Sequence, residues 1–410
     1  MFRFLHAADL HMDSPLKGLS QFNPELAEKI RKASRLALDN LIRVAKEQKV
    51  AFVVIAGDIL DGGVRDQGTI QFLLSRLGEL AQSIPVYLIR GNHDAVNNLG
   101  ANLVWPKNVH QFGGDKAGTV SVHGLPVAIH GQSFASKEAT ENLAAAYPEA
   151  VAGHFNIGIL HTSLAGREGH DTYAPVTPEQ LKSKRYDYWA LGHIHKREMV
   201  REGDPWIVFP GNIQGRSIRE TGPRGCAIVT VEGSLQARAE FVDLDVVRFH
   251  EVEVDLSGME LLEELTERVR EAAQQVIRSG SISVARVRLV GITKHAGNLA
   301  ANRDLIGDVR QTLSGLGISL EKLKIECREP EARSEGADAA EEMFGAVAQE
   351  WQSNHDALKR ILDGDTEFQS LGKKLGNVLS EEEIKDLLNP EEVLPALEQH
   401  LKTLSAKTWV

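Results

Sequence analysis

The chain has 410 residues, of which 42% are hydrophobic, and a formal net charge of −11. This length leaves room for two or three globular domains. Its two cysteines, Cys226 and Cys327, lie far apart, which argues against a disulfide framework or a structural zinc site. The first residues form no long apolar leader and no run of 18 apolar residues occurs, so we expect a cytoplasmic protein without a membrane partner.

The negative charge is concentrated toward the C-terminus. Residues 331–410 contain 8 Lys and Arg against 17 Asp and Glu, a net charge of −9, whereas residues 1–330 carry −2. Binding to a phosphate backbone depends on where charges are placed rather than on their sum. The overall acidity therefore does not exclude a nucleic-acid partner.

Residues 1–240 alternate between short apolar strands and amphipathic helices. Asn23-Pro24 is typical of a helix start, and apolar residues recur at helical spacing over 26–44 and 70–81. From about residue 118 the pattern favours strands, at 119–123, 127–130, 207–209, 227–231 and 237–244. Helices followed by hairpins predict an α/β fold, a mixed-sheet sandwich with helices outside.

A second unit begins near Arg248. Strand patterns at 249–254, 282–290 and 318–325 are separated by helical patterns at 262–276 and 305–313, which predicts a compact α+β domain. After Pro330 the composition turns to Ala, Glu and Gly, and a capping box at Ser380-x-x-Glu383 precedes a leucine stripe. We expect domains at 1–245 and 246–330, a linker at 331–339 and a helical tail at 340–410.

Residue types that bind metals follow five of the predicted strands. The segments are Asp9-x-His11, Gly57-Asp58, Gly91-Asn92-His93-Asp94, His161 and Gly192-His193-x-His195. In open α/β sheets, ligands bind at the carboxyl ends of strands. Any one segment could be a turn or a structural histidine, but the five together predict a shared metal site.

Such a ligand set suits two divalent ions. Two ions roughly 3.5–4 Å apart can bind a phosphate, activate water and stabilise the leaving oxygen of an in-line displacement. Asp58 is the natural bridging carboxylate, and the amide and imidazole ligands favour Mn²⁺, with Fe²⁺ and Mg²⁺ as alternatives. His93 is then free to protonate the leaving oxygen or stabilise the phosphorane, with Asp94 as its expected orienting partner.

These segments resemble the calcineurin-like metallophosphoesterase superfamily over residues 1–215. The opening Phe4-Leu-His-Ala-Ala-Asp-Leu-His-Met-Asp-Ser-Pro-Leu and the later Pro210-Gly-Asn-Ile-Gln-Gly-Arg-Ser-Ile-Arg-Glu-Thr-Gly resemble, more narrowly, the bacterial YhaO-type DNA repair exonucleases, relatives of SbcD. The resemblance implies a four-layer α/β/β/α sandwich, a small α+β capping domain and a helical C-terminal tail.

The resemblance also implies how the ligands are shared between two ions. One ion would be bound by Asp9, His11, Asp58 and His195. The other would be bound by Asp58, Asn92, His161 and His193, with His93 as the acid or transition-state stabiliser. One departure is Asp61, where some nucleases of this branch have a histidine, and it leaves a second catalytic imidazole open.

Substrate specificity is expected outside the metal ligands. Arg216, Arg219 and Arg224 lie on a glycine-punctuated loop suited to bind backbone phosphates, although a solvated turn would have the same composition. His170 and Tyr173 are candidates for the substrate entrance, where a tyrosine could stack on a base. Simple surface packing is the alternative for both.

Together these features predict a Mn²⁺-dependent DNA exonuclease, with endonuclease activity open, that acts in DNA repair or end processing by hydroxide attack at two metals. The chain has no Gly-x-x-x-x-Gly-Lys-Ser/Thr loop, and the resemblance implies an SMC-like ABC ATPase as a separate partner. The helical tail is the expected docking element, with its own cap or a homodimer mate as alternatives. Two other functions stay open: a metallophosphoesterase for small nucleotides or phosphoproteins, and a partner-binding scaffold with a decayed site.

Overall fold

A computed structural model describes residues 1–14, 24–61, 66–96, 103–137, 139–164, 173–233, 235–277 and 280–330. Residues 1–329 form one compact unit and residues 330–410 a second. The predicted linker and helical tail lie outside the described residues. Among the helices that are described, none is long and apolar enough to cross a membrane.

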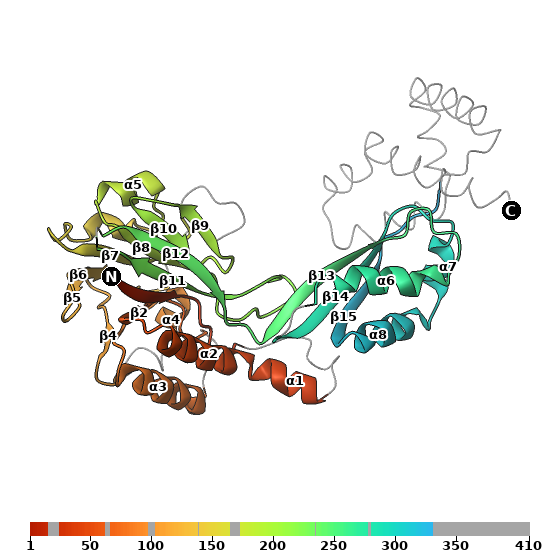
Figure 1. The fold of residues 1–410 in the computed structure, drawn as a ribbon, viewed down its shortest axis with the longest axis horizontal. Coiled ribbons are helices and arrows are strands. Elements are labelled where there is room, and N and C mark those ends of the chain that lie inside the picture. Colours follow the sequence, from red (N-terminus) through yellow and green to blue (C-terminus); the bar gives the residue numbers. More distant parts are fainter. Residues whose placement is uncertain are drawn as a thin grey trace, which may run out of the picture. The chain divides into compact units, whose positions relative to one another are not determined.

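Figure 1 labels the helices and strands. The strands are β1 (Phe2–Ala7), β2 (Phe52–Ala56), β3 (Val86–Ile89), β4 (Val109–Gln111), β5 (Gly118–Ser121), β6 (Val127–Gly131), β7 (Phe155–His161), β8 (Tyr188–Gly192), β9 (Glu198–Arg201), β10 (Trp206–Phe209), β11 (Gly225–Val231), β12 (Ala237–Asp243), β13 (Val247–Asp255), β14 (Ile282–Val290) and β15 (Ile318–Ile325). The helices are α1 (Pro24–Arg31), α2 (Ala33–Glu47), α3 (Gln67–Ala81), α4 (Asn92–Val96), the 3₁₀ helix η2 (Leu143–Ala146), α5 (Pro178–Ser183), α6 (Glu264–Gln274), α7 (Ala296–Ala301) and α8 (Leu305–Gly315).

Two six-stranded sheets enclose the largest aromatic core. Their strand orders are β12-β11-β1-β2-β3-β4 and β5-β6-β7-β8-β10-β9. Phe4 of β1 stacks on Phe52 of β2, with ring centroids 5.1 Å apart, and meets Tyr188 of β8 edge-on at 5.2 Å. Each such buried side chain contributes roughly 1.5–3 kcal/mol to folding. The two sheets are therefore held face to face by their inward-pointing side chains.

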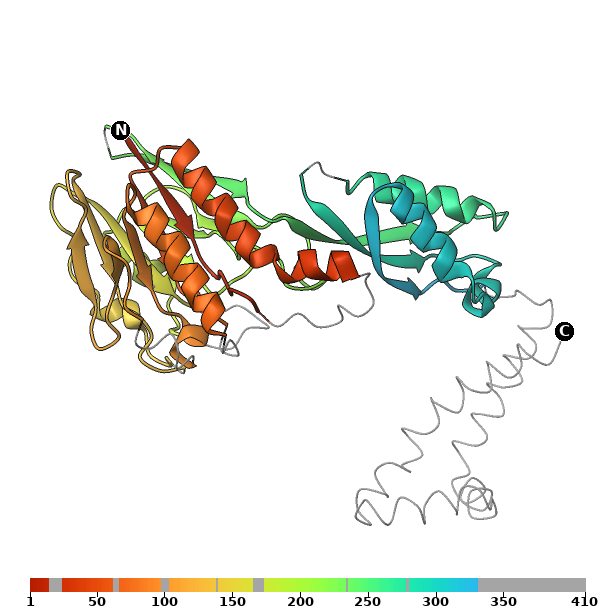
Figure 2. The same cartoon turned by 90° about the horizontal axis from the view of Figure 1, so that it is seen from below.

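Helices cover the outer faces of both sheets. On the first sheet, Leu41 of α2 and Leu77 of α3 are fully buried with Val53 of β2 in one apolar cluster. Figure 2 shows α2 and α3 lying side by side on this face. On the second sheet, Trp189 of β8 packs in a cluster with Leu181 of α5. This arrangement confirms the predicted four-layer α/β/β/α sandwich.

The single helix expected over residues 26–44 is divided into α1 and α2. The two helices meet at Lys32, whose ψ of 0° with φ −88° departs from helical values although its amide still donates to Glu28 and its carbonyl accepts from Leu36, both at 3.1 Å. Ile30 of α1 packs in one cluster with Phe249 and Val284 of the third sheet, whereas α2 from Ala37 onward packs on the first sheet. The periodicity is the same on both sides of the break, because both segments bury one apolar face.

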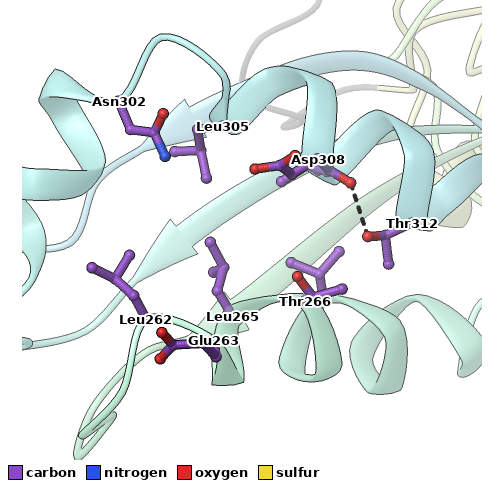
Figure 3. Close-up of a pocket in the computed structure, with 10 residues that line it drawn as sticks. Leu262, Glu263, Leu265, Thr266, Asn302, Leu305, Asp308 and Thr312 are labelled. Atoms are coloured by element: carbon purple, nitrogen blue, oxygen red, sulfur yellow. Dashed lines mark hydrogen bonds between the residues drawn. The ribbon is translucent and has the colours of Figure 1, made fainter.

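A third sheet has the order β13-β14-β15 and is parallel throughout. α6 and α8 bury Val269 and Leu313 against Val287 of β14. A cavity of about 260 Å³ lies between these helices, with an apolar floor that includes Leu265 and a polar rim that includes Asp308 (Figure 3). The boundary expected at 245/246 falls between the end of β12 and the start of β13.

Candidate metal centre

The strands that precede the five metal-type segments all end at one edge of the packed sheets. β1, β2 and β3 run parallel in the first sheet, and β7 and β8 run parallel in the second. The chain then places the side chains of Asp9, His11, Asp58, Asn92, His93, His161, His193 and His195 at these strand ends. The structure therefore brings together residues that are up to 186 positions apart, from Asp9 to His195.

Several of these residues have a left-handed backbone. The φ angles are 51° at Asp9, 41° at His11, 50° at Asp58 and 100° at His193. For residues with a Cβ, this conformation costs roughly 1–2 kcal/mol each. Backbone hydrogen bonds hold it in place, since the amides of Asp9 and His11 donate to the carbonyls of Gly57 and Asp58, both at 3.0 Å. Strain concentrated in this way is typical of functional sites.

Two glycines let the segments approach closely. Gly57 has φ 87°, and a Cβ there would lie 2.6 Å from Nδ1 of His161. At Gly192 a Cβ would lie 1.9 Å from the carbonyl oxygen of Ala56. Only glycine fits at either position without moving a neighbouring strand end.

Asp58 occupies the middle of the cluster. Its Oδ2 lies 3.6 Å from Nε2 of His11 and 3.5 Å from Nε2 of His161. Nε2 of His11 is 3.1 Å from Nε2 of His195, and Nε2 of His161 is 2.9 Å from Oδ1 of Asn92. The ring nitrogens therefore converge on two positions on either side of one carboxylate.

The innermost members of the cluster are buried. Asp9, His11, Asp58 and His161 are each no more than 2% exposed. Burial and the nearby Asp58 carboxylate raise the pKa of Asp9 well above its usual range, and burial raises the pKa of Asp58 to about 6. Burial also lowers the pKa of His161 to about 3, which keeps the imidazole neutral. Neutral imidazoles beside carboxylates are the protonation state that binds metals.

These donors fit divalent metal ions. Among the residues that the structure describes, three groups have ligand atoms within 4.8 Å of one another: Asp9, His11 and His195; His11, Asp58 and His93; and Asp9, Asp58 and His161. A mixture of carboxylate, imidazole and amide donors suits Mn²⁺, Fe²⁺ or Zn²⁺ better than Ca²⁺. A cation would also relieve the repulsion between the two buried carboxylates.

His93 lies at the edge of the cluster, with its side chain 37% exposed. Its Nδ1 is 2.8 Å from Oδ1 of Asp61, and its ring centroid is 4.9 Å from that of His11. The hydrogen bond to Asp61 raises the pKa of His93 and holds the pKa of Asp61 well below its usual range. This pairing favours an imidazolium beside the metal ligands.

The expected contact between Asp94 and His93 is wrong. The Asp94 carboxylate accepts three backbone hydrogen bonds, from the amides of Ile59 at 3.1 Å, Leu60 at 2.8 Å and Gly91 at 2.9 Å. Asp94 lies at the start of the short helix α4, so its buried side chain points back at these amides. It connects the segments after β2 and β3, and Asp61 is the residue that orients His93.

Glu220 holds His195, a role that sequence analysis missed. Oε1 of Glu220 is 2.8 Å from Nδ1 of His195, so the Nδ1–H donates to it and Nε2 is directed to the cluster. Burial opposes ionisation of Glu220, but its hydrogen bond to His195 and the charges of His195 and Arg216 outweigh it and lower its pKa to about 2. Metal-binding histidines are commonly oriented by such a carboxylate. The only sequence signal was its place in the arginine-containing loop.

The three arginines of that loop have different environments. Arg219 is exposed. Arg216 lies at the metal centre, 3.7 Å from Oδ2 of Asp61 and 3.3 Å from Oε1 of Glu220. Arg224 is only 7% exposed and donates to the carbonyl of His195 and, at 2.8 Å, to that of Thr221. The expectation that Arg224 binds substrate phosphates is therefore wrong, because the residue is buried and both of its terminal nitrogens donate to groups inside the protein.

Tyr173, a further candidate, lies beside the histidine ligands. The ring of Tyr173 lies 5.3 Å from that of His193, which in turn lies 5.2 Å from the ring of His161. The backbone amide of His193 donates to both carboxylate oxygens of Asp9 at 3.0 Å. The structure thus places Tyr173 beside the ligands, and His170 lies outside the described residues.

The fold and the donor set define a metallophosphoesterase. The family model for calcineurin-like phosphoesterases matches residues 2–197, and the model for the middle domain of metallophosphoesterase YhaO matches residues 249–328. The chain belongs to the calcineurin-like phosphoesterase family, which uses two divalent metal ions. Its relatives include the metallophosphoesterase YhaO of Bacillus subtilis strain 168, which is 30% identical over 407 residues, 98% of each chain.

More distant similarity extends to a component of a nuclease. The SbcD component of the nuclease SbcCD from Staphylococcus saprophyticus is 25% identical over 278 residues, covering 61% of this chain and 71% of that one. Among solved structures, a dimetal phosphatase from Danio rerio is 13% identical, with a TM-score of 0.36 over 58% of this chain and 98% of its own. The protein TT1561 of Thermus thermophilus is 11% identical, with a TM-score of 0.33 over 59% of this chain and 99% of its own.

Proposed function

We propose that this phosphoesterase is a DNA nuclease that depends on Mn²⁺ and acts in DNA repair or end processing in the cytoplasm. The observation that carries the metal chemistry is the position of Asp58, whose Oδ2 faces both His11 and His161 at about the same distance. The similarity to the SbcD component of a nuclease supports a nucleic acid as the substrate. Exposed Arg219 and half-buried Arg216 near the metal centre support contact with backbone phosphates.

In this proposal two groups of residues, with Asp58 common to both, would hold two ions. Asp9, His11, Asp58 and His195 would hold one ion. Asp58, Asn92, His161 and His193 would hold the other. When bound, such ions orient the phosphodiester, lower the pKa of a water molecule and stabilise the charge of the transition state. The strained strand ends and the glycines fix these side chains before substrate arrives.

His93 supplies a proton in this proposal. Asp61 accepts the hydrogen bond from Nδ1, which leaves the proton on Nε2 as the one that can pass to the leaving oxygen of the DNA strand. Because Asp61 favours the imidazolium, His93 enters the reaction charged. The same charge stabilises the phosphate oxygens if the leaving oxygen is protonated by solvent.

The direct test is cleavage of end-labelled linear duplex and single-stranded DNA with Mn²⁺, comparing the full chain with His93→Ala. The proposal predicts cleavage that fails with EDTA and falls at least about 100-fold in the variant. The label then gives the polarity and the balance between exonuclease and endonuclease activity. Cleavage that is equal in the variant would mean a contaminating nuclease and would contradict the proposal.

A second candidate is hydrolysis of small nucleotide phosphodiesters. It is favoured by the internal pairing of Arg216 and Arg224, which leaves Arg219 as the exposed arginine of the loop. Arg219→Gln separates the two candidates, because it should weaken DNA cleavage about tenfold while leaving an aryl phosphodiester unaffected. The assay should also be run with an ATPase partner present, because DNA cleavage could depend on that partner. Robust turnover of the small substrate without DNA cleavage under those conditions would support the second candidate.

We also propose that an SMC-like ABC ATPase binds this chain through the tail at 340–410. The similarity to a component of SbcCD supports a partner, and the leucine stripe at 394, 397, 401 and 404 supports a helical docking surface. Co-purification of the full chain and of Leu397→Glu/Leu401→Glu with such an ATPase tests this. Undiminished binding by the variant would contradict docking through the stripe.

A further inference from the structure

A second polar cavity, of about 630 Å³, lies apart from the metal centre. α2, the segment after β8, the start of β13 and the segment before β14 line it, and none of the proposed metal ligands does. Its volume is in the range that holds small-molecule ligands. The side chains that matter here are those of Arg43, Arg197, Arg248 and Ser281.

The two carboxylates that line the cavity are already bonded. Oδ1 of Asp243 accepts from Nη1 of Arg197 at 2.8 Å, and its Oδ2 accepts from Nη2 of Arg248 at 2.8 Å. Asp245 accepts from Nε of Arg248 at 2.7 Å and from its Nη2 at 2.6 Å. These carboxylates therefore fix the guanidinium groups in place and have little capacity left for a cation.

Donors remain on the same arginines. Arg248 has a side chain only 9% exposed, and its Nη1 meets no acceptor among the described residues. The guanidinium of Arg197 lies 5.3 Å from the ring centroid of Phe241 and uses Nη1 alone for Asp243. Arg43 bonds Glu47 through Nη1 only and is more than half exposed. A guanidinium carries five N–H donors, so each of the three can still bind an anion.

Ser281 is a further unfilled donor at the wall of this cavity. Its Oγ is buried and has no hydrogen-bond partner among the residues that the structure describes. Leaving a buried hydroxyl without a partner costs about 1–3 kcal/mol as a general rule. A ligand with acceptor oxygens would satisfy it.

We propose that this cavity binds a phosphate monoester of mononucleotide size. The planar guanidinium forks of Arg197 and Arg248 match the oxygens of a phosphate, Arg43 adds a third positive charge and Ser281 donates a hydroxyl. The apolar surfaces of Pro223 and Val276 also line the cavity and offer room for a sugar or base. This site uses none of the metal ligands, so it stands or fails independently of the proposed nuclease function.

The test is isothermal titration of the full-length protein with dAMP, inorganic phosphate and deoxyadenosine, with EDTA present so that the metal centre holds no ion. The two phosphates should bind and deoxyadenosine should not. Arg197→Gln and Arg43→Gln should each weaken dAMP binding about tenfold, and Ser281→Ala about threefold. Arg238→Gln, an exposed arginine paired with Glu240 on β12, is the matched control and should bind dAMP normally.

Two results would overturn the site. One is the absence of phosphate binding, or equal binding of deoxyadenosine, in a protein whose thermal unfolding shows it to be folded; the arginines are then only a structural ion-pair network. The other is loss of binding in Arg216→Gln with normal binding in Arg197→Gln, which would place the phosphate at the metal centre. Because Arg43 is exposed, its variant should fold even if Arg197→Gln does not.

Discussion

The metal centre and the charged face of the third sheet both gather charged side chains, but they balance them differently. On the sheet face, turned away from α6 and α8, Arg286 lies 2.8 Å from Glu321 and Arg288 lies 3.0 Å from Glu253. These pairs are partly exposed and each charge has a partner of opposite sign. At the metal centre, burial raises the pKa of both Asp9 and Asp58, and the Asp58 carboxylate raises that of Asp9 further. Burial also lowers the pKa of the neighbouring His11 and His161, which keeps these two imidazoles neutral.

This difference shows what each region requires. The positive and negative side chains of the sheet face pair with one another, and water screens the charge that stays exposed. The metal centre is balanced only when a cation is added, because burial makes paired carboxylates costly without one. Five predictions from four substitutions test that contrast, beginning with the largest expected effect and ending with the smallest.

Asp58→Asn should abolish the metal chemistry. It removes the carboxylate oxygen that faces both His11 and His161. A bound metal contributes several kcal/mol of transition-state stabilisation, so we expect phosphodiester hydrolysis to fall by about 10³-fold or more. Steady-state rates on an aryl phosphodiester at saturating Mn²⁺ measure this. Asp39→Asn, which alters a surface pair with Arg76, should keep its activity.

The same variant should stabilise the metal-free fold. The pKa of Asp58 is raised to about 6 in the folded chain, against 3.8 in the unfolded one. A carboxyl with a raised pKa stabilises the fold below the unfolded value and loses that contribution as pH rises through the folded value. At pH 8 with EDTA we expect Asp58→Asn to raise the free energy of unfolding by about 2 kcal/mol. Lower stability than wild type in urea unfolding would contradict an unbalanced carboxylate.

Asp61→Asn should change the pH dependence of hydrolysis. Asp61 raises the pKa of His93, and a general acid is active in its protonated form. The wild-type rate should therefore fall as pH rises above that pKa, and the variant should lose activity at lower pH. We expect a further loss of about tenfold or more at neutral pH. If the hydrolysis rates of both proteins fall at the same alkaline pH, Asp61 does not act through His93.

Glu220→Gln should weaken metal binding while leaving the fold intact. The neutral amide is a poorer acceptor for Nδ1–H of His195, so Nε2 is less well fixed toward the metal. Loss of such an orienting carboxylate typically costs about 10–100-fold in metal affinity. Calorimetric titration with Mn²⁺ measures this, with Glu240→Gln on the surface of β12 as the matched control. Equal Mn²⁺ affinities in Glu220→Gln and Glu240→Gln would show that Glu220 does not orient His195 for metal binding.

Arg286→Gln should have the smallest effect. It breaks the pair with Glu321, whose side chains are 22% and 15% exposed. Partly exposed pairs of this kind contribute about 1 kcal/mol or less. Urea unfolding should show a change of that size, with unchanged hydrolysis and Mn²⁺ affinity. A large loss of hydrolytic activity in Arg286→Gln would show that the sheet face affects the metal centre, which would contradict the difference drawn between the two regions.

The fold class followed from the sequence because its signals are local. Alternating apolar runs marked most of the strands, and family-like segments at strand ends indicated a four-layer sandwich, which the structure confirms. The division at Lys32 was not predictable, because the periodicity is unchanged across it and the packing of Ile30 with residues of β13 and β14 exists only in the folded chain. Parallel pairing in the third sheet was also hidden, since alternation shows which face is buried and not which strand is the neighbour.

The candidate site divides in the same way. The proposed ligands could be found because each lies at the end of a strand or within a few residues of it, so sequence order predicts their place in space. The roles of Asp61 and Glu220 were missed because they depend on contacts that form only in the folded chain. Asp61 contacts His93, and Glu220 contacts His195. The prediction that Arg224 binds phosphates was wrong for the same reason. Nothing in the sequence of a glycine-rich loop shows that one of its arginines turns inward to a backbone carbonyl.

The most direct test of the account is the number of Mn²⁺ ions bound per chain, measured by calorimetric titration of metal-free protein and checked by elemental analysis. We expect two ions per chain for the wild type and at most one for Asp58→Asn, with unchanged stoichiometry in Arg286→Gln. One ion or none in a folded wild-type protein would contradict the central claim that the buried carboxylates at the strand ends form a two-metal phosphoesterase centre.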